Sequence, residues 1–275
     1  MRKNYKENSA NFLMNTKEDF GGNKRGQVTI FVIIAIAIVG LVAATVFFFP
    51  RIQEAIAPGT FSASNYLREC VEPDLKPTIE SLAKHGGYTD PEGFILYEGE
   101  KVKYLCYSSE YYQTCAIQEP IVKGNFETQL NTLLTSRASQ CFSNLKREYE
   151  RRGFAVSAKE AETAIEIIPG KIRATFAAPF TITKGETTQT FEKFEADISS
   201  EMYELLFIAQ SIVEFEATYG DSETTLYMQY YPNLKIDKRK LDDGSKIYIL
   251  SNVVTKESFT FASRSQAWPP GYGTE

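Results

Sequence analysis

One long apolar stretch stands out from the otherwise mixed pattern of the chain. Positions 28–49 read VTIFVIIAIAIVGLVAATVFFF and contain no charged side chain. As a helix this stretch would be about 33 Å long, which matches a hydrocarbon core of about 30 Å. A buried helix of a soluble protein normally keeps a polar face over such a length. The pattern therefore predicts a single transmembrane helix at residues 27–49.

Basic residues are concentrated before this stretch. Residues 1–26 carry six Lys or Arg against three Asp or Glu, so their net charge is +3, whereas the remainder sums to −8 within a chain total of −5. Basic flanks stay on the cytoplasmic side, so residues 1–26 are predicted to be cytoplasmic and the C-terminal domain extracellular. An acidic domain repels phosphate backbones, so we expect no nucleic-acid partner.

Composition divides the part of the chain after the apolar run. Residues 50–63, which contain Pro58-Gly59, are expected to be a stalk or linker. Residues 64–265 have the mixed composition and the size of a single soluble domain. Residues 266–275 contain Trp-Pro-Pro-Gly-Tyr-Gly, which is incompatible with regular structure and predicts a flexible tail.

Three stretches of the domain have apolar residues at helical spacing. They predict helices at about residues 64–83, 126–149 and 199–219. Pro73 and Pro77 are expected to split the first helix into two short pieces, because proline removes a helix hydrogen bond.

Strand-like segments fill most of the rest and are separated by turn signals. Pro169-Gly170, Lys184-Gly185-Glu186 and Asp242-Asp243-Gly244-Ser245 each predict a hairpin. Because hairpins join antiparallel strands, we expect an α+β fold: one N-terminal transmembrane helix, then an antiparallel-sheet ectodomain with packed helices. The expected strands are Phe94–Tyr97, Lys101–Tyr107, Ala164–Ile168, Lys171–Ala177, Phe180–Thr183, Thr187–Phe194, Leu234–Leu241, Lys246–Leu250 and Ser258–Ala262.

All four cysteines follow the apolar run and would face an oxidising space. Three pairings are possible. We favour Cys106–Cys115, as the two arms of a hairpin, with Cys70–Cys141 joining two helices. The longer closure would contribute roughly 4 kcal/mol in the chain-entropy model. No close Cys pair of zinc-site type is present, so no metal is expected.

The junction Lys24-Arg25-Gly26-Gln27 before the apolar run resembles the class III signal peptide of archaeal type IV pilins and archaellins. The resemblance implies cleavage after Gly26 by a prepilin-type peptidase, with the apolar helix retained on the mature protein. In filament-forming members that helix packs against other pilin-like subunits. GQVTIFVII is also similar to the N-terminus of uncharacterised archaeal envelope proteins, which implies a surface location.

Two further features near the N-terminus bear on the pilin resemblance and on conventional cleavage. Many pilins carry Glu at the fifth mature position, where this chain has Phe31. This departure weakens the resemblance to a major filament subunit more than it weakens the prediction of a membrane anchor. Ala55-Ile56-Ala57 has the form of a conventional signal-peptidase site. The apolar run exceeds the usual 7–15 residues of such a peptide, and Pro58 disfavours cleavage there.

Catalytic signatures are missing from the sequence. The chain has one histidine, His85, which is expected to cap a helix end. It has no nucleophile elbow, phosphate loop or dinucleotide fingerprint. The carboxylate pair Asp242-Asp243 is interpreted as a turn, and Glu214 with Glu216 as a solvated helix face. We therefore expect no enzyme and no cofactor, with a membrane-tethered hydrolase as the least favoured alternative.

Aromatic residues are the one compositional excess, with 16 Tyr and 19 Phe. One group surrounds the hairpin cysteines and consists of Tyr104, Tyr107, Tyr111 and Tyr112, of which the last three would form the contact loop. A second group consists of Tyr227, Tyr230 and Tyr231. Packing in a β-rich core is the simpler interpretation. The alternative is an exposed loop that contacts protein or glycan.

Together these patterns predict a membrane-anchored extracytoplasmic structural protein of type IV pilin-like type, either a minor filament subunit or a cell-envelope module. Its expected partners are the lipid bilayer and other pilin-like subunits. The alternative is an anchored adhesion or binding module that uses exposed tyrosines.

Overall fold

The computed structural model describes residues 33–39 and 61–269. The chain divides into two compact units, residues 1–60 and 61–275, which are described separately. In the first unit, residues 33–39 are helical and exposed. The rest of the predicted membrane helix, the cytoplasmic segment and most of the stalk lie outside the described residues. Within the described ranges, no helix combines the length and the apolar character needed to cross a membrane.

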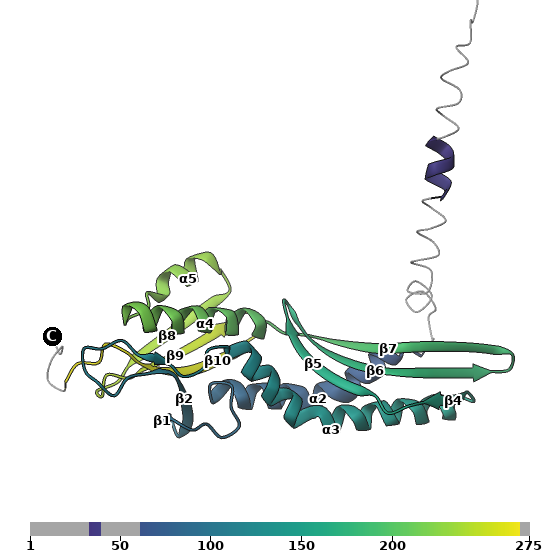
Figure 1. Cartoon of the computed structure of the whole chain (residues 1–275), viewed down its shortest axis with the longest axis horizontal. Helices are drawn as coiled ribbons and strands as arrows, with labels where there is room; N and C mark the ends of the chain where they lie inside the picture. Colours follow the sequence, from purple (N-terminus) through teal and green to yellow (C-terminus); the bar gives the residue numbers. More distant parts are fainter. Residues whose placement is uncertain (1–32, 40–60, 270–275) are drawn as a thin grey trace, which may run out of the picture. The chain divides into compact units, whose positions relative to one another are not determined.

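The second unit is a mixed α+β fold with two sheets (Figure 1). Its helices are α2 (Ala63–Lys84), α3 (Val122–Arg151), α4 (Met202–Tyr219) and α5 (Thr224–Tyr230). Its strands are β1 (Phe94–Tyr97), β2 (Glu100–Tyr107), β3 (Ala116–Ile117), β4 (Ala155–Ala158), β5 (Glu162–Ile168), β6 (Lys171–Lys184), β7 (Thr187–Ser199), β8 (Leu234–Lys240), β9 (Lys246–Asn252) and β10 (Ser258–Arg264).

The strands form one sheet of six and one of four. The larger sheet has the order β1-β2-β10-β9-β8, with β3 also paired to β2. In the smaller sheet, β4 and β5 pair with successive parts of the long strand β6, and β7 pairs with its other side. Every pairing is antiparallel except that of β2 with β10, which is parallel. The expected α+β class with antiparallel sheets is confirmed.

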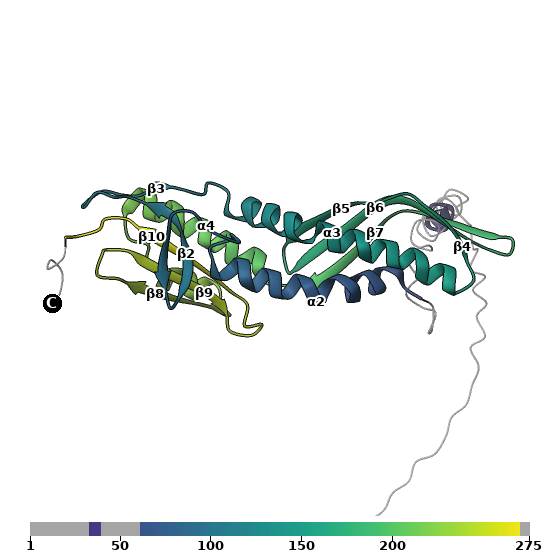
Figure 2. The same ribbon diagram turned by 90° about the horizontal axis from the view of Figure 1, so that it is seen from below.

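Helices α2 and α3 lie side by side and connect the two sheets (Figure 2). Helix α2 contacts β7 of the smaller sheet and β10 of the larger one. The disulfide Cys70–Cys141 joins α2 to α3, with the two Cα atoms 5.8 Å apart. Phe142 of α3 packs against Phe176 and Phe180 of β6, so the core of this region is aromatic.

The predicted break in the first helix is wrong, because α2 runs unbroken through Pro73 and Pro77. Both prolines lie on its exposed side, whereas Leu67, Val71 and Leu75 on the opposite side are fully buried. Proline frees the carbonyl four residues earlier. On an exposed helix side water can satisfy that carbonyl, while the buried stripe holds the helix in place.

The predicted strands Lys171–Ala177 and Phe180–Thr183 are one strand, β6, which corrects their separation. A bulge between Ala177 and Phe180 shifts the register against β7. Pro179 lies in this bulge, which is one of the positions where a sheet tolerates a residue without an N–H. Each of the three predicted hairpin turns does connect two antiparallel strands.

Candidate functional site: a disulfide-closed aromatic loop

Residues 108–114, which we call the aromatic loop, connect β2 to β3. The disulfide Cys106–Cys115 closes the base of this loop, with the two Cα atoms 5.3 Å apart. Both disulfides expected from the sequence are therefore present, and no cysteine of the described region is free. The closed base fixes where the loop leaves the larger sheet.

Arg264, at the end of β10, attaches the start of the loop to the sheet. Its Nη1 donates to the carbonyl oxygen of Ser108, and its Nε donates to the carbonyl oxygen of Asp243 at 3.0 Å. The Ser108 N–H donates in return to the Arg264 carbonyl oxygen at 2.9 Å. The guanidinium also lies over the Tyr111 ring, 5.2 Å from its centroid. Arg264 thus holds both the backbone and one aromatic ring of the loop.

Residues 266–268 attach the other half of the loop. The Tyr112 N–H donates to the Ala267 carbonyl oxygen at 2.9 Å, and the Gln266 N–H donates to the Gln113 carbonyl oxygen at 2.8 Å. The Tyr112 and Trp268 rings meet edge to face, with their centroids 5.1 Å apart. These residues belong to the expected flexible tail, yet Ala267 is buried. The beginning of the tail is thus packed on the domain.

Four aromatic side chains remain accessible at this loop. The exposed fractions are 39% for Tyr107, 41% for Tyr111, 49% for Tyr112 and 55% for Trp268. Tyr104, three residues before Tyr107 on β2, is buried and its hydroxyl lies 2.7 Å from Ser245 Oγ. The tyrosines of the loop therefore present ring surface to solvent on a backbone held by a disulfide and several hydrogen bonds.

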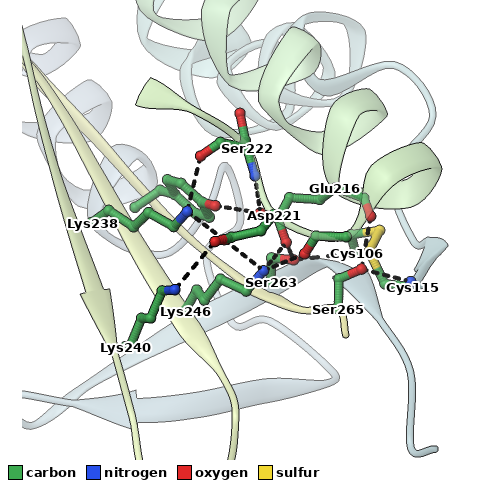
Figure 3. Close-up of polar contacts among 12 residues, drawn as sticks. Cys106, Cys115, Glu216, Asp221, Ser222, Lys238, Lys240, Lys246, Ser263 and Ser265 are labelled. Atoms are coloured by element: carbon green, nitrogen blue, oxygen red, sulfur yellow. Dashed lines mark hydrogen bonds and ion pairs between the residues drawn. A yellow bond between two sulfur atoms is a disulfide. The ribbon is translucent and has the colours of Figure 1, made fainter. Parts of the chain in front are cut away.

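A buried polar network lies beneath the loop (Figure 3). Glu216 of α4 is completely buried and accepts hydrogen bonds from Lys246 Nζ at 2.7 Å, Ser263 Oγ at 2.9 Å and the Tyr248 hydroxyl. The Ser222 N–H donates to the same carboxylate at 2.8 Å. Four donors around one carboxylate offset the cost of removing its charge from water.

The interpretation of Glu214 and Glu216 as a solvated face is therefore wrong for Glu216. Only Glu214 is exposed, where it accepts a hydrogen bond from Gln210. Position 216 continues the buried helical spacing of Ile212 and Val213, and this periodicity was the available signal. The partners of Glu216 come from β9 and β10, which are far along the chain, so the sequence did not reveal them.

The network reaches the aromatic loop through Ser265. Its hydroxyl donates to the Glu216 carbonyl oxygen at 2.7 Å and accepts from the Cys115 N–H at 3.0 Å. Ser263 Oγ lies 3.8 Å from Cys115 Sγ. Cys115 of the loop-closing disulfide thus contacts Ser263 and Ser265, and both of these serines also donate hydrogen bonds to Glu216.

Asp221 extends the network toward solvent. It pairs with Lys238, with Lys246 at 3.1 Å and with Lys240 at 3.2 Å. Burial alone would raise the pKa of Asp221, but the hydrogen bonds and charges of Lys238 and Lys246 outweigh this and lower its pKa to about 2. Burial and the neighbouring Glu216 charge raise the pKa of Tyr248. The carboxylates of Glu216 and Asp221 are both paired with lysines, so this cluster is suited to stabilising the fold.

The remaining candidate residues have local roles. His85 forms the C-terminal cap of α2, and its Nε2 lies 3.0 Å from Glu100 Oε2. Asp243 accepts from the N–H and hydroxyl of Ser245 and so forms the turn before β9. Within the part of the chain that the structure describes, no three His, Cys, Asp or Glu side chains are placed to hold a metal ion. The proposed processing residues Lys24, Arg25, Gly26 and Gln27 lie outside it.

Comparison with known proteins finds no matching protein-family model, no matching curated protein and no matching solved structure.

Proposed function

We propose that this protein is a membrane-anchored extracytoplasmic structural protein, pilin-like at its N-terminus, that serves as a minor filament subunit or a cell-envelope module. One observation carries the proposal: a domain with both of its cysteine pairs oxidised follows a 22-residue uncharged stretch. Disulfides persist in oxidising compartments, and the apolar stretch has the length of a bilayer span. The basic-Gly-Gln junction at residues 24–27 adds the resemblance to class III signal peptides.

Sequencing the N-terminus of the protein isolated from cell membranes tests this proposal. Processing of the pilin type yields a chain that begins at Gln27 and stays in the membrane fraction. A chain that begins at Met1 in the membrane fraction supports a permanent envelope anchor, and Gly26→Val should change nothing in that case. Recovery of the intact chain in the soluble fraction without detergent would reject both forms of the proposal.

The aromatic loop favours a second function, adhesion through exposed tyrosines. Tyrosine offers a large contact area at a small cost in side-chain entropy, and a loop fixed before binding loses little further entropy. Arg264, the Cys106–Cys115 disulfide and the hydrogen bonds to residues 266 and 267 supply this rigidity. We propose that the loop contacts protein or glycan on a neighbouring surface.

The second function is tested by binding of the purified chain to isolated cell envelopes. Tyr111→Ala combined with Tyr112→Ala should reduce binding at least tenfold while the far-UV circular dichroism stays unchanged. Tyr219→Ala is the matched control, because Tyr219 is 68% exposed at the end of α4. Equal binding by both variants would exclude the loop as the contact surface, and unfolding of the double variant would assign these tyrosines to packing.

A further inference from the structure

An aromatic groove separates α4 from α5, away from the aromatic loop. Its volume is about 600 Å³, and its lining includes Phe207 and Phe215 of α4 together with Leu226, Tyr227, Tyr230 and Tyr231 on or next to α5. The exposed fractions are 57% for Phe207, 54% for Leu226 and 81% for Tyr230. Large apolar side chains gathered in one exposed depression mark an interaction site.

The walls of this groove are held in place. The Tyr227 hydroxyl lies 2.8 Å from Ser211 Oγ, which ties α5 to α4. Met228 Sδ accepts from the Ile236 N–H at 3.4 Å, which ties α5 to β8. Glu223 is the only charged side chain in the lining that the structure describes. A rigid, nearly uncharged aromatic groove suits a proline-rich peptide, because such grooves bind the preformed polyproline II helix.

The C-terminal segment of the chain begins three residues after Gln266, which contacts one end of α4. A Cβ added at Gly220, the residue that ends α4, would lie 2.0 Å from Gln266 Cγ, so residue 266 touches this helix end. The residues that follow Trp268 read Pro-Pro-Gly-Tyr-Gly-Thr-Glu. This segment contains adjacent prolines and an aromatic residue, which is the chemistry that the groove fits.

The length of the C-terminal segment can be compared with the distance from the end of α4 to the groove. In a polyproline II conformation the seven residues of Pro269–Glu275 would extend about 22 Å. Along α4, Phe215 is about 7.5 Å from Gly220 and Phe207 is about 20 Å from it, at 1.5 Å per residue. Because the segment begins three residues after Gln266, part of this length is needed to return to the end of α4. The segment is thus long enough to reach Phe215, at the near end of the groove.

We propose that Pro269–Glu275 of the same chain lies in the aromatic groove between α4 and α5. A tethered segment meets its own groove at an effective concentration in the millimolar range, well above that of a second copy in dilute solution. The proposal is independent of the function proposed above, because it concerns the C-terminal segment and the groove alone.

A labelled peptide with the sequence PPGYGTE tests the proposal by fluorescence polarisation. It is titrated with the full chain in detergent and with a chain that stops after Trp268. The truncated chain should bind the peptide, and the full chain should bind it at least tenfold more weakly because its own segment competes. Tyr272→Ala in the full chain should restore part of the peptide binding, and it leaves the described domain untouched.

Leu226→Ala in the truncated chain should weaken peptide binding at least fivefold, and Leu96→Ala is the matched control. Both are leucines with more than half of their surface exposed, but Leu96 lies on β1. No binding by a folded truncated chain would overturn the proposal. Equal binding by the two chains would also overturn it. In that case a concentration-dependent dimer of the full chain would identify a second copy as the occupant. A monomer would indicate that the groove binds a peptide of another protein. If the truncated chain does not fold, unchanged binding by Tyr272→Ala refutes the proposal.

Discussion

Replacing Glu216 by glutamine should destabilise the domain strongly, although it hardly changes the size of the side chain. The Glu216 side chain has no exposed surface and that of Lys246 is 6% exposed. After the substitution, the Lys246 ammonium loses its nearest counter-charge, which lies 2.7 Å away. It keeps the Gly220 carbonyl oxygen and the carboxylate of Asp221 at 3.1 Å.

The magnitude follows from this partial loss. Leaving one partner of a buried ion pair uncompensated costs about 3–5 kcal/mol. Because Asp221 remains, Glu216→Gln should cost about 3 kcal/mol, at the low end of this range. Replacing Lys246 by methionine as well removes the stranded charge, so the double variant should be more stable than Glu216→Gln alone by at least about 1 kcal/mol.

Urea-induced unfolding, followed by far-UV circular dichroism of the full chain in detergent, measures these differences. Glu214→Gln is the matched control, because this neighbouring carboxylate is exposed and should change the free energy of unfolding by less than about 0.5 kcal/mol. A cost below about 1 kcal/mol for Glu216→Gln would refute the buried ion pair. So would a double variant that is less stable than the single one.

Three further predictions concern stability. Replacing Cys70 and Cys141 together by serine should lower the free energy of unfolding by roughly 4 kcal/mol, because the pair closes a long loop with a sequence separation of 71; an unchanged urea midpoint would contradict this. Gly220→Ala should cost more than Gly170→Ala in thermal unfolding, because both positions have positive φ but only at Gly220 would the new Cβ collide with another residue, Gln266. The pKa of Asp221 is lowered from 3.8 to about 2 in the fold, so its contribution is complete above about pH 4 and lost as the pH falls through 2. Between pH 4 and 2 the melting temperature should therefore fall further for the natural chain than for Asp221→Asn, and parallel profiles would contradict this assignment.

Local chemistry explains what could be predicted from the sequence. The apolar stripe of α3 needs only the 3.6-residue period, and Phe126, Leu130 and Leu145 on it are fully buried. The hairpin turns depend on glycine next to a turn-forming residue. The pairing of the cysteines followed from their places on one hairpin and two helices.

Features that depend on distant partners were missed. The parallel pairing of β2 with β10 joins Tyr104 to Ala262, and no turn signal records such a contact. The burial of Glu216 depends on Lys246, Tyr248 and Ser263, which lie 30 or more residues further along the chain. Unbroken α2 likewise depends on packing that overrides the effect of its two prolines.

Labelling of a cysteine introduced into the β6–β7 hairpin tests most directly whether the domain lies outside the cytoplasmic membrane. Thr188→Cys places a thiol at an exposed position of β7, and both natural cysteine pairs are oxidised. If the domain lies outside the membrane, a membrane-impermeant maleimide should label this thiol in intact cells as fully as in lysed cells. Labelling that occurs only after lysis would contradict an extracytoplasmic domain.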